Sequence, residues 1–140
     1  MNKKLSIYFI ILFYFSCNSD KQFNVYYGNW EISNMYYKNN CLTFKKGDVI
    51  NYNFSLGFEK NNTLWIEDLD TTKTIYSDFK FSKVNEQTIL KIFKSDDFRI
   101  NGIYKIQIDT IRINTESCLL KLTAKSDKVF FIARRNFSRY

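Results

Sequence analysis

Hydrophobic and polar residues alternate along most of this chain after residue 20. In the longest example, from Ile50 to Phe58, apolar residues occupy every second position, and polar or small residues fill the positions between them. A period of two places all the apolar side chains on one face, which is typical of a half-buried β-strand. No stretch has the 3.6-residue period of an amphipathic helix, so the pattern predicts an all-β protein.

Similar segments follow one another at short intervals, separated by clusters of Asp, Asn, Ser and Lys, and the chain contains no proline and four glycines. This spacing predicts an antiparallel up-and-down meander of about eight or nine strands without helical crossovers. A change of phase near Asp109-Thr110 predicts a β-bulge. The expected strands are Val25 to Ile32, Leu42 to Phe44, Ile50 to Phe58, Leu64 to Leu69, Thr74 to Phe81, Thr88 to Phe93, Ile103 to Ile113, Cys118 to Ala124 and Lys128 to Arg135.

The first seventeen residues have a different pattern. Lys3 and Lys4 precede an unbroken apolar run from Ile7 to Phe15, and Ser16-Cys17 follow it. A cationic start, a short apolar segment and a small residue before a cleavage site form the layout of a secretory signal. Nine residues are too few to remain as a spanning helix, because such a helix needs about 20.

The sequence around Cys17 resembles the lipobox of bacterial lipoproteins, although only Ser16 and Cys17 of Tyr14-Phe15-Ser16-Cys17 match the family pattern. The resemblance implies a signal peptide over residues 1 to 16, a fatty-acylated Cys17 with a tether over residues 17 to 24, and one domain over residues 25 to 140. It also implies a lipid-anchored protein of the bacterial cell envelope, at the outer membrane. The alternatives are an ordinary signal peptide cleaved elsewhere or a buried strand.

If Cys17 carries lipid, Cys41 and Cys118 remain. An even pair in an oxidising compartment is compatible with a disulfide. Cys118 also shares an apolar face with Leu120 and Leu122, as a buried free thiol would. The sequence leaves both interpretations open.

Gly28-Asn29-Trp30 begins the expected domain, and Arg134-Arg135 stands on its last strand. This pair of motifs resembles the lipocalin-like family. In that family the tryptophan of Gly-x-Trp lies across the closed end of a barrel, and an arginine of the last strand covers it. The resemblance implies a closed barrel in which either Arg134 or Arg135 stacks on Trp30; a plain core role for Trp30 is the alternative.

The residues needed for most enzyme mechanisms are missing. The chain has no histidine, which is the commonest general base and metal ligand. The carboxylate pairs Asp68 with Asp70 and Asp96 with Asp97 are ordinary turn residues by position. We therefore expect no catalytic activity, no metal and no cofactor.

Charge and aromatic content suggest what the protein binds. Of 21 basic residues two lie in the leader, so 19 remain against 14 acidic ones, spread along the strands. Such a modest, mixed charge does not predict a nucleic-acid groove. Fourteen phenylalanines, ten tyrosines and two tryptophans exceed the needs of a small core. The additional rings either fill the barrel interior completely or line a cup for an apolar or planar ligand. The expected function is a lipid-anchored barrel that binds a small apolar ligand; the alternative is a protein-binding envelope module, such as a hydrolase inhibitor or complex subunit.

Overall fold

The computed structural model describes residues 21 to 138, apart from residues 39, 42 to 53, 70, 113, 115 and 116. The leader, Cys17, the strand expected at Leu42 to Phe44, the first half of the strand expected at Ile50 to Phe58, and Asp70 therefore lie outside the described residues. The side chains of Cys41, Arg112 and Ser138 are not described either, although their backbones belong to the strands given below.

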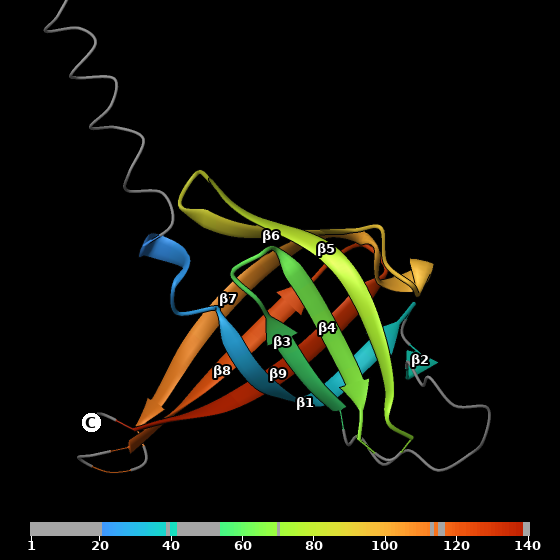
Figure 1. The fold of residues 1–140 in the computed structure, drawn as a ribbon. Helices are drawn as coiled ribbons and strands as arrows, with labels where there is room; N and C mark the ends of the chain where they lie inside the picture. The colour runs from blue at the N-terminus through green and yellow to red at the C-terminus, as the bar shows by residue number, and fades with distance from the viewer. Residues whose placement is uncertain are drawn as a thin grey trace, which may run out of the picture.

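Within the described residues, nine antiparallel strands form one sheet, and eight of them close into a barrel (Figure 1). Each strand pairs with the next along the chain, except that β2 pairs only with the end of β1. The meander predicted from the alternation is confirmed. The strands are β1 (Gly28–Tyr37), β2 (Asn40–Cys41), β3 (Phe54–Phe58), β4 (Thr63–Asp68), β5 (Lys73–Val84), β6 (Gln87–Phe93), β7 (Gly102–Arg112), β8 (Ser117–Lys125) and β9 (Val129–Ser138).

The barrel closes where β1 pairs with β9, from Glu31 opposite Arg134 to Tyr37 opposite Val129. The register shifts between Ile32 and Asn34, so Ser33 is the extra residue of a bulge. The prediction of a bulge near Asp109-Thr110 is wrong, because β7 pairs with β8 without interruption through this region.

The alternating apolar residues of all eight barrel strands point inward and form a single core. On β1 the buried positions are Trp30, Ile32 and Met35, so the bulge changes which parity faces the core. On β7 Tyr104 and Ile106 are buried, whereas Ile111, on the other parity, is 47% exposed. The apolar pattern of β7 therefore changes phase because Ile111 is an exposed apolar residue, and not because the strand has a bulge.

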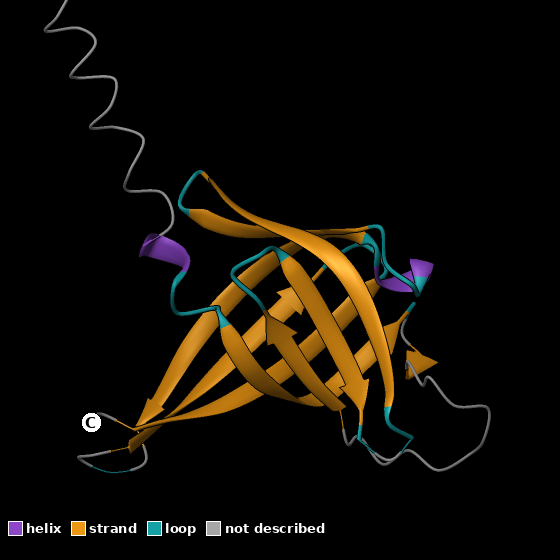
Figure 2. Ribbon diagram, in the orientation of Figure 1, coloured by secondary structure: helices purple, strands orange, loops and turns teal. Residues whose placement is uncertain are grey.

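In the part of the chain that the structure describes, two short 3-10 helices, coloured purple in Figure 2, lie at the ends of the barrel. The first, η1 (Lys21–Phe23), precedes β1, and its Phe23 is buried against the core. Residues 21 to 23 fall within the segment expected to be a tether, and of these three residues Phe23 packs against the core. The second, η2 (Phe98–Ile100), lies between β6 and β7.

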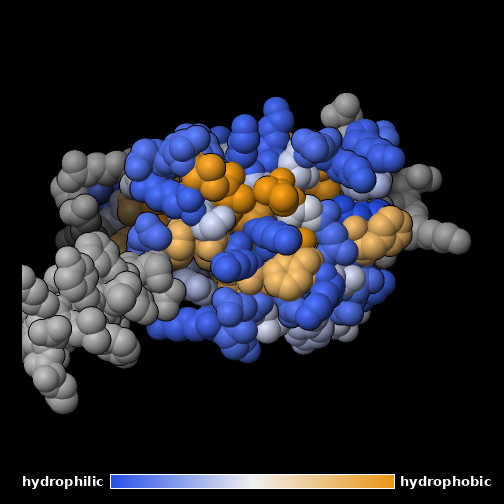
Figure 3. All heavy atoms as spheres, turned by 90° about the horizontal axis from the view of Figure 1, so that it is seen from above, coloured by the Kyte–Doolittle hydropathy of each residue, from blue (hydrophilic) through white to orange (hydrophobic). Residues whose placement is uncertain are grey.

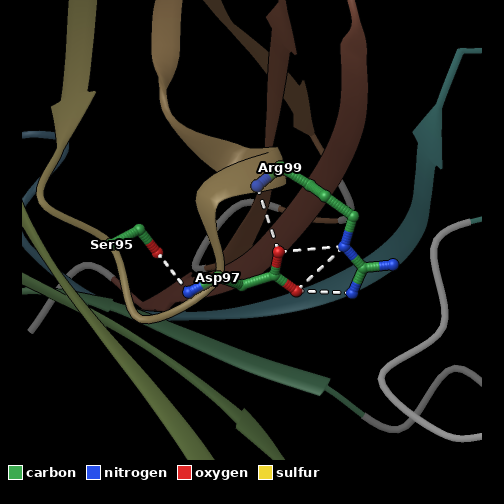
Figure 4. Close-up of polar contacts among 3 residues, drawn as sticks. All are labelled: Ser95, Asp97 and Arg99. Carbon is green, nitrogen blue, oxygen red and sulfur yellow. Dashed lines mark hydrogen bonds and ion pairs between the residues drawn. The ribbon is translucent and has the colours of Figure 1, made fainter.

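At the η2 end, Ile100 is completely buried and its carbonyl accepts a hydrogen bond from the hydroxyl of Tyr104 at 2.5 Å. Burial raises the pKa of Tyr104. Asp97 caps η2 by accepting from the backbone N–H of Arg99 at 3.1 Å, and its carboxylate also binds the Arg99 guanidinium (Figure 4). These hydrogen bonds lower the pKa of Asp97. This loop is thus a structured cover of the barrel end.

Among the residues that the structure describes, no helix has the length and apolar character needed to cross a membrane.

Cys118 is a free thiol, partly buried against the core. Cys41 lies beside Tyr36, which pairs with Phe130, whereas Cys118 pairs with Phe137. Seven residues of β9 separate these two positions, about 23 Å at the rise of a strand. A disulfide needs Cα atoms within about 7 Å. Of the two interpretations, the free thiol is the one the structure contains.

Candidate functional site

Trp30 and Arg135 meet at the end of the barrel that η1 covers. The guanidinium carbon of Arg135 lies 4.4 Å from the centroid of the Trp30 ring. The indole is 2% exposed, and its N–H donates a hydrogen bond to the carbonyl of Tyr26 at 2.8 Å. A cation over an indole face is attracted by the ring quadrupole. The contact joins the first and last strands, so it reinforces barrel closure.

Arg135 also holds the segment that leads into β1. Its two terminal nitrogens donate to the carbonyls of Tyr27 at 2.6 Å and Val25 at 2.7 Å. Burial lowers the pKa of the guanidinium, yet an arginine stays protonated in proteins. One side chain of the last strand therefore fastens both the tryptophan and the chain before it.

Gly28 allows the guanidinium to come this close. It has a φ of +103°, and a Cβ built on it would lie 3.0 Å from a terminal nitrogen of Arg135. L-residues with a side chain rarely adopt such a backbone conformation. The glycine of Gly28-Asn29-Trp30 thus serves both the turn into β1 and the approach of the arginine.

Arg134 points away from this site. Its side chain is exposed, and it lies opposite Glu31 on β1 and Lys121 on β8. The inward positions of β9 are Val129, Phe131 and Ala133, and Arg135 continues that parity. Of the two arginines that the sequence left open, Arg135 is the one that stacks on Trp30.

Six aromatic rings fill the space between η1 and the barrel end. Phe81 contacts all five other rings, with centroid distances from 4.9 to 5.8 Å. Phe58 packs edge-on against Phe79 at 5.1 Å. Such ring pairs stabilise beyond their buried area. This aromatic cluster consists of Phe23, Tyr26, Tyr27, Phe58, Phe79 and Phe81.

A pocket of about 610 Å³ opens beside the aromatic cluster. It forms where β5 extends beyond the end of β4. Asp78 is the last residue of β5 that pairs with β4, and the backbone N–H of Phe79 donates a hydrogen bond to the carbonyl of Asn62 in the turn before β4. Its apolar lining includes Phe23, Tyr27, Phe79, Phe81 and Phe93.

The rim of this aromatic pocket is polar, with Asn61, Asn62, Asp78 and Lys80 around it. Small-molecule sites in proteins typically have a volume of roughly 300 to 1,000 Å³, an apolar lining and a few polar groups. The volume of the pocket is in this range, and its lining combines five aromatic residues with four polar ones. It suits a small planar or apolar molecule, and its polar rim could orient one polar substituent.

Three of the four carboxylates considered as catalytic candidates have structural partners, and the fourth, Asp70, lies outside the described residues. Asp68 is buried, against the expectation of a solvated turn residue, and accepts hydrogen bonds from the backbone N–H and the hydroxyl of Thr71. Asp96 accepts from the backbone N–H of Tyr76, and Asp97 binds Arg99. These contacts account for each acid as a turn or loop stabiliser. Within the described ranges, no three His, Cys, Asp or Glu side chains gather as a potential metal site.

Sequence reasoning identified Trp30, Gly28 and the arginine pair, but it missed the pocket. The signal was present in Phe79 and Phe81, which alternate with Asp78 and Lys80, and in Phe23, an isolated aromatic residue before the first strand. What the sequence could not show is that β5 extends beyond β4 and leaves a gap there.

No protein-family model, curated protein or solved structure matches this chain.

Proposed function

We propose that this barrel binds a small apolar, planar ligand in the aromatic pocket and has no catalytic role. The observation that carries the proposal is the pocket itself, whose volume and aromatic lining fit such a molecule. The closed barrel is compatible with ligand binding. Phe93 lies on a rigid strand and is partly exposed, so little conformational entropy is lost when a ligand ring stacks on it.

The experiment is a titration with N-phenyl-1-naphthylamine, a planar apolar dye that fluoresces when it leaves water. We expect saturable binding by the wild-type chain and a loss of about fivefold in affinity for Tyr27→Ala, since one aromatic contact is worth about 1 kcal/mol. Tyr76→Ala is the matched control, because Tyr76 is 54% exposed and lies outside the pocket lining. It should bind the dye as the wild type does.

Thermal melting of each variant shows whether it is folded. Should Tyr27→Ala not fold, Phe93→Ser removes a partly exposed ring from the same pocket. Unchanged dye binding by a folded pocket variant would argue against this site. Native mass spectrometry of the purified protein should also reveal a retained small molecule. A stoichiometric protein recovered from an envelope extract, with no small molecule, would favour the protein-binding alternative.

We further propose that the protein acts at the bacterial cell envelope, anchored at the outer membrane through acylated Cys17. The support is the order of charged, apolar and small residues from Lys3 to Cys17. Stable anchoring takes more than one acyl chain, and the bacterial lipoproteins that this leader resembles carry two or three.

Labelling cells with an alkyne palmitate analogue tests the anchor. The wild-type chain should incorporate the label and fractionate with membranes, and Cys17→Ser should lose both properties. Cys118→Ser is the control and should retain them. An unlabelled wild type would refute the anchor without affecting the dye experiment.

A further inference from the structure

Charge is divided between the two halves of the barrel wall. Strands β1, β3 and β4 contain three acidic residues and no lysine or arginine, whereas β5 to β9 contain ten basic and two acidic residues. The strand order makes each group contiguous. Without the buried Asp68, the inward Arg135 and Arg112, whose side chain is not described, two acidic residues remain on β1, β3 and β4, against eight basic and two acidic residues on β5 to β9. The even spread of charge along the sequence therefore becomes a polarised outer surface in the folded protein.

Four exposed lysines concentrate this charge on the outer side of β5 to β8. Lys80 lies directly opposite Lys91, and Lys105 directly opposite Lys125. Like charges at directly opposed positions destabilise a sheet. Among the described residues none of these four lysines forms an ion pair. We call them, with the residues between them, the lysine face.

Apolar side chains alternate with these lysines. Ile89 lies opposite Lys105, and Ile103 opposite Lys91. Ile103 is 63% exposed. Figure 3 shows the molecule from above, that is, from the side on which β5 and β6 lie in Figure 1. A band of hydrophobic side chains crosses this face, with hydrophilic side chains around it. The lysine face thus combines cations with exposed aliphatic groups.

We propose that the lysine face binds a negatively charged lipid surface. Lysines at a membrane place their ammonium groups among anionic headgroups and their stems along apolar groups. Isoleucines between them reach the boundary of the acyl chains. An anionic surface would also relieve the repulsion between Lys80 and Lys91 and between Lys105 and Lys125. The proposal rests on register and exposure, and it requires neither the aromatic pocket nor acylated Cys17.

The experiment measures how strongly the full chain carrying Cys17→Ser sediments with phosphatidylcholine vesicles, with and without phosphatidylglycerol. In this background we compare Lys91→Gln/Lys105→Gln/Lys125→Gln with the control Lys38→Gln/Lys60→Gln/Lys128→Gln. The control lysines are exposed turn residues, so net charge changes equally. Lys80 is left intact because it also lines the aromatic pocket.

Each lysine near an anionic membrane contributes about fivefold in affinity. The lysine-face variant should therefore lose about a hundredfold of the preference for phosphatidylglycerol vesicles, and the control should keep most of it. Salt should weaken wild-type binding strongly, since it screens charges beyond about 10 Å at 0.1 M. Ile103→Ser should weaken binding in high salt, where the apolar contribution dominates.

Equal losses in both triple variants would mean that net charge, and not this face, attracts the vesicles, and would overturn the proposal. So would equal binding to vesicles with and without phosphatidylglycerol, or no binding. A cooperative thermal transition near that of the wild type shows that the lysine-face variant is folded, whether or not the pocket binds the dye.

Discussion

Replacing Arg135 by alanine should lower the free energy of unfolding by about 3 kcal/mol. The substitution removes a cation stacked on Trp30, worth about 0.5 to 2 kcal/mol, and two charge-assisted hydrogen bonds to the carbonyls of Val25 and Tyr27. Hydrogen bonds to charged groups contribute roughly 1.5 to 3 kcal/mol each, and less where water has access. Denaturant unfolding followed by tryptophan fluorescence measures the loss.

Arg134→Ala provides the matched control, one residue away on the same strand. Arg134 is exposed and opposite Glu31, and surface charges of this kind contribute less than about 1 kcal/mol. Arg135→Lys should recover part of the loss, because an ammonium keeps the charge but cannot donate to two carbonyls from a planar fork. Equal destabilisation by Arg134→Ala and Arg135→Ala would show that Arg135 does not fasten this end of the barrel.

The second large effect is expected at Trp30, and it separates a closing residue from a plain core residue. Trp30→Ala should cost about 4 kcal/mol, as for other buried large aromatic residues. If Trp30 were a plain core residue, the losses of unfolding free energy caused by Trp30→Ala and Arg135→Ala would simply add. If Arg135 instead stacks on the indole, the double variant should be less destabilised than the sum of the single variants by about 1 kcal/mol.

The cycle requires every variant to fold, and single-domain proteins have only about 5 to 15 kcal/mol of stability. Should the double variant be unfolded, the same cycle with Trp30→Leu retains an apolar side chain and still removes the aromatic face. Strict additivity in either cycle would assign Trp30 to ordinary core packing.

The alternation of apolar residues was enough to predict the architecture, because a period of two identifies both the strands and their buried faces. It did not locate the bulge. On β1 the apolar set changes parity between Ile32 and Met35, and that change is a real bulge; on β7 a similar change ends in the exposed Ile111. Only the register of the neighbouring strand distinguishes the two cases, and a single sequence does not contain it.

The site was predictable to a similar degree. Gly28, Trp30 and the arginine pair stand out as residues, but both parities of β9 are apolar up to Arg134 and Arg135, so alternation alone could not say which arginine faces inward. The pocket and the lysine face depend on which strands lie side by side and where they end. Those relations arise from pairing between distant segments, which composition and spacing do not record.

The pairing of β1 with β9 has a consequence for how the protein forms. Glu31 and Arg134 are neighbours in the barrel although about a hundred residues separate them in the chain. Contacts between such distant segments carry a large loop-closure entropy and slow the search for the native state. During synthesis the first strand must remain without its final neighbour until the C-terminal residues emerge, so a truncation that removes β9 should leave the earlier strands unable to complete the cylinder.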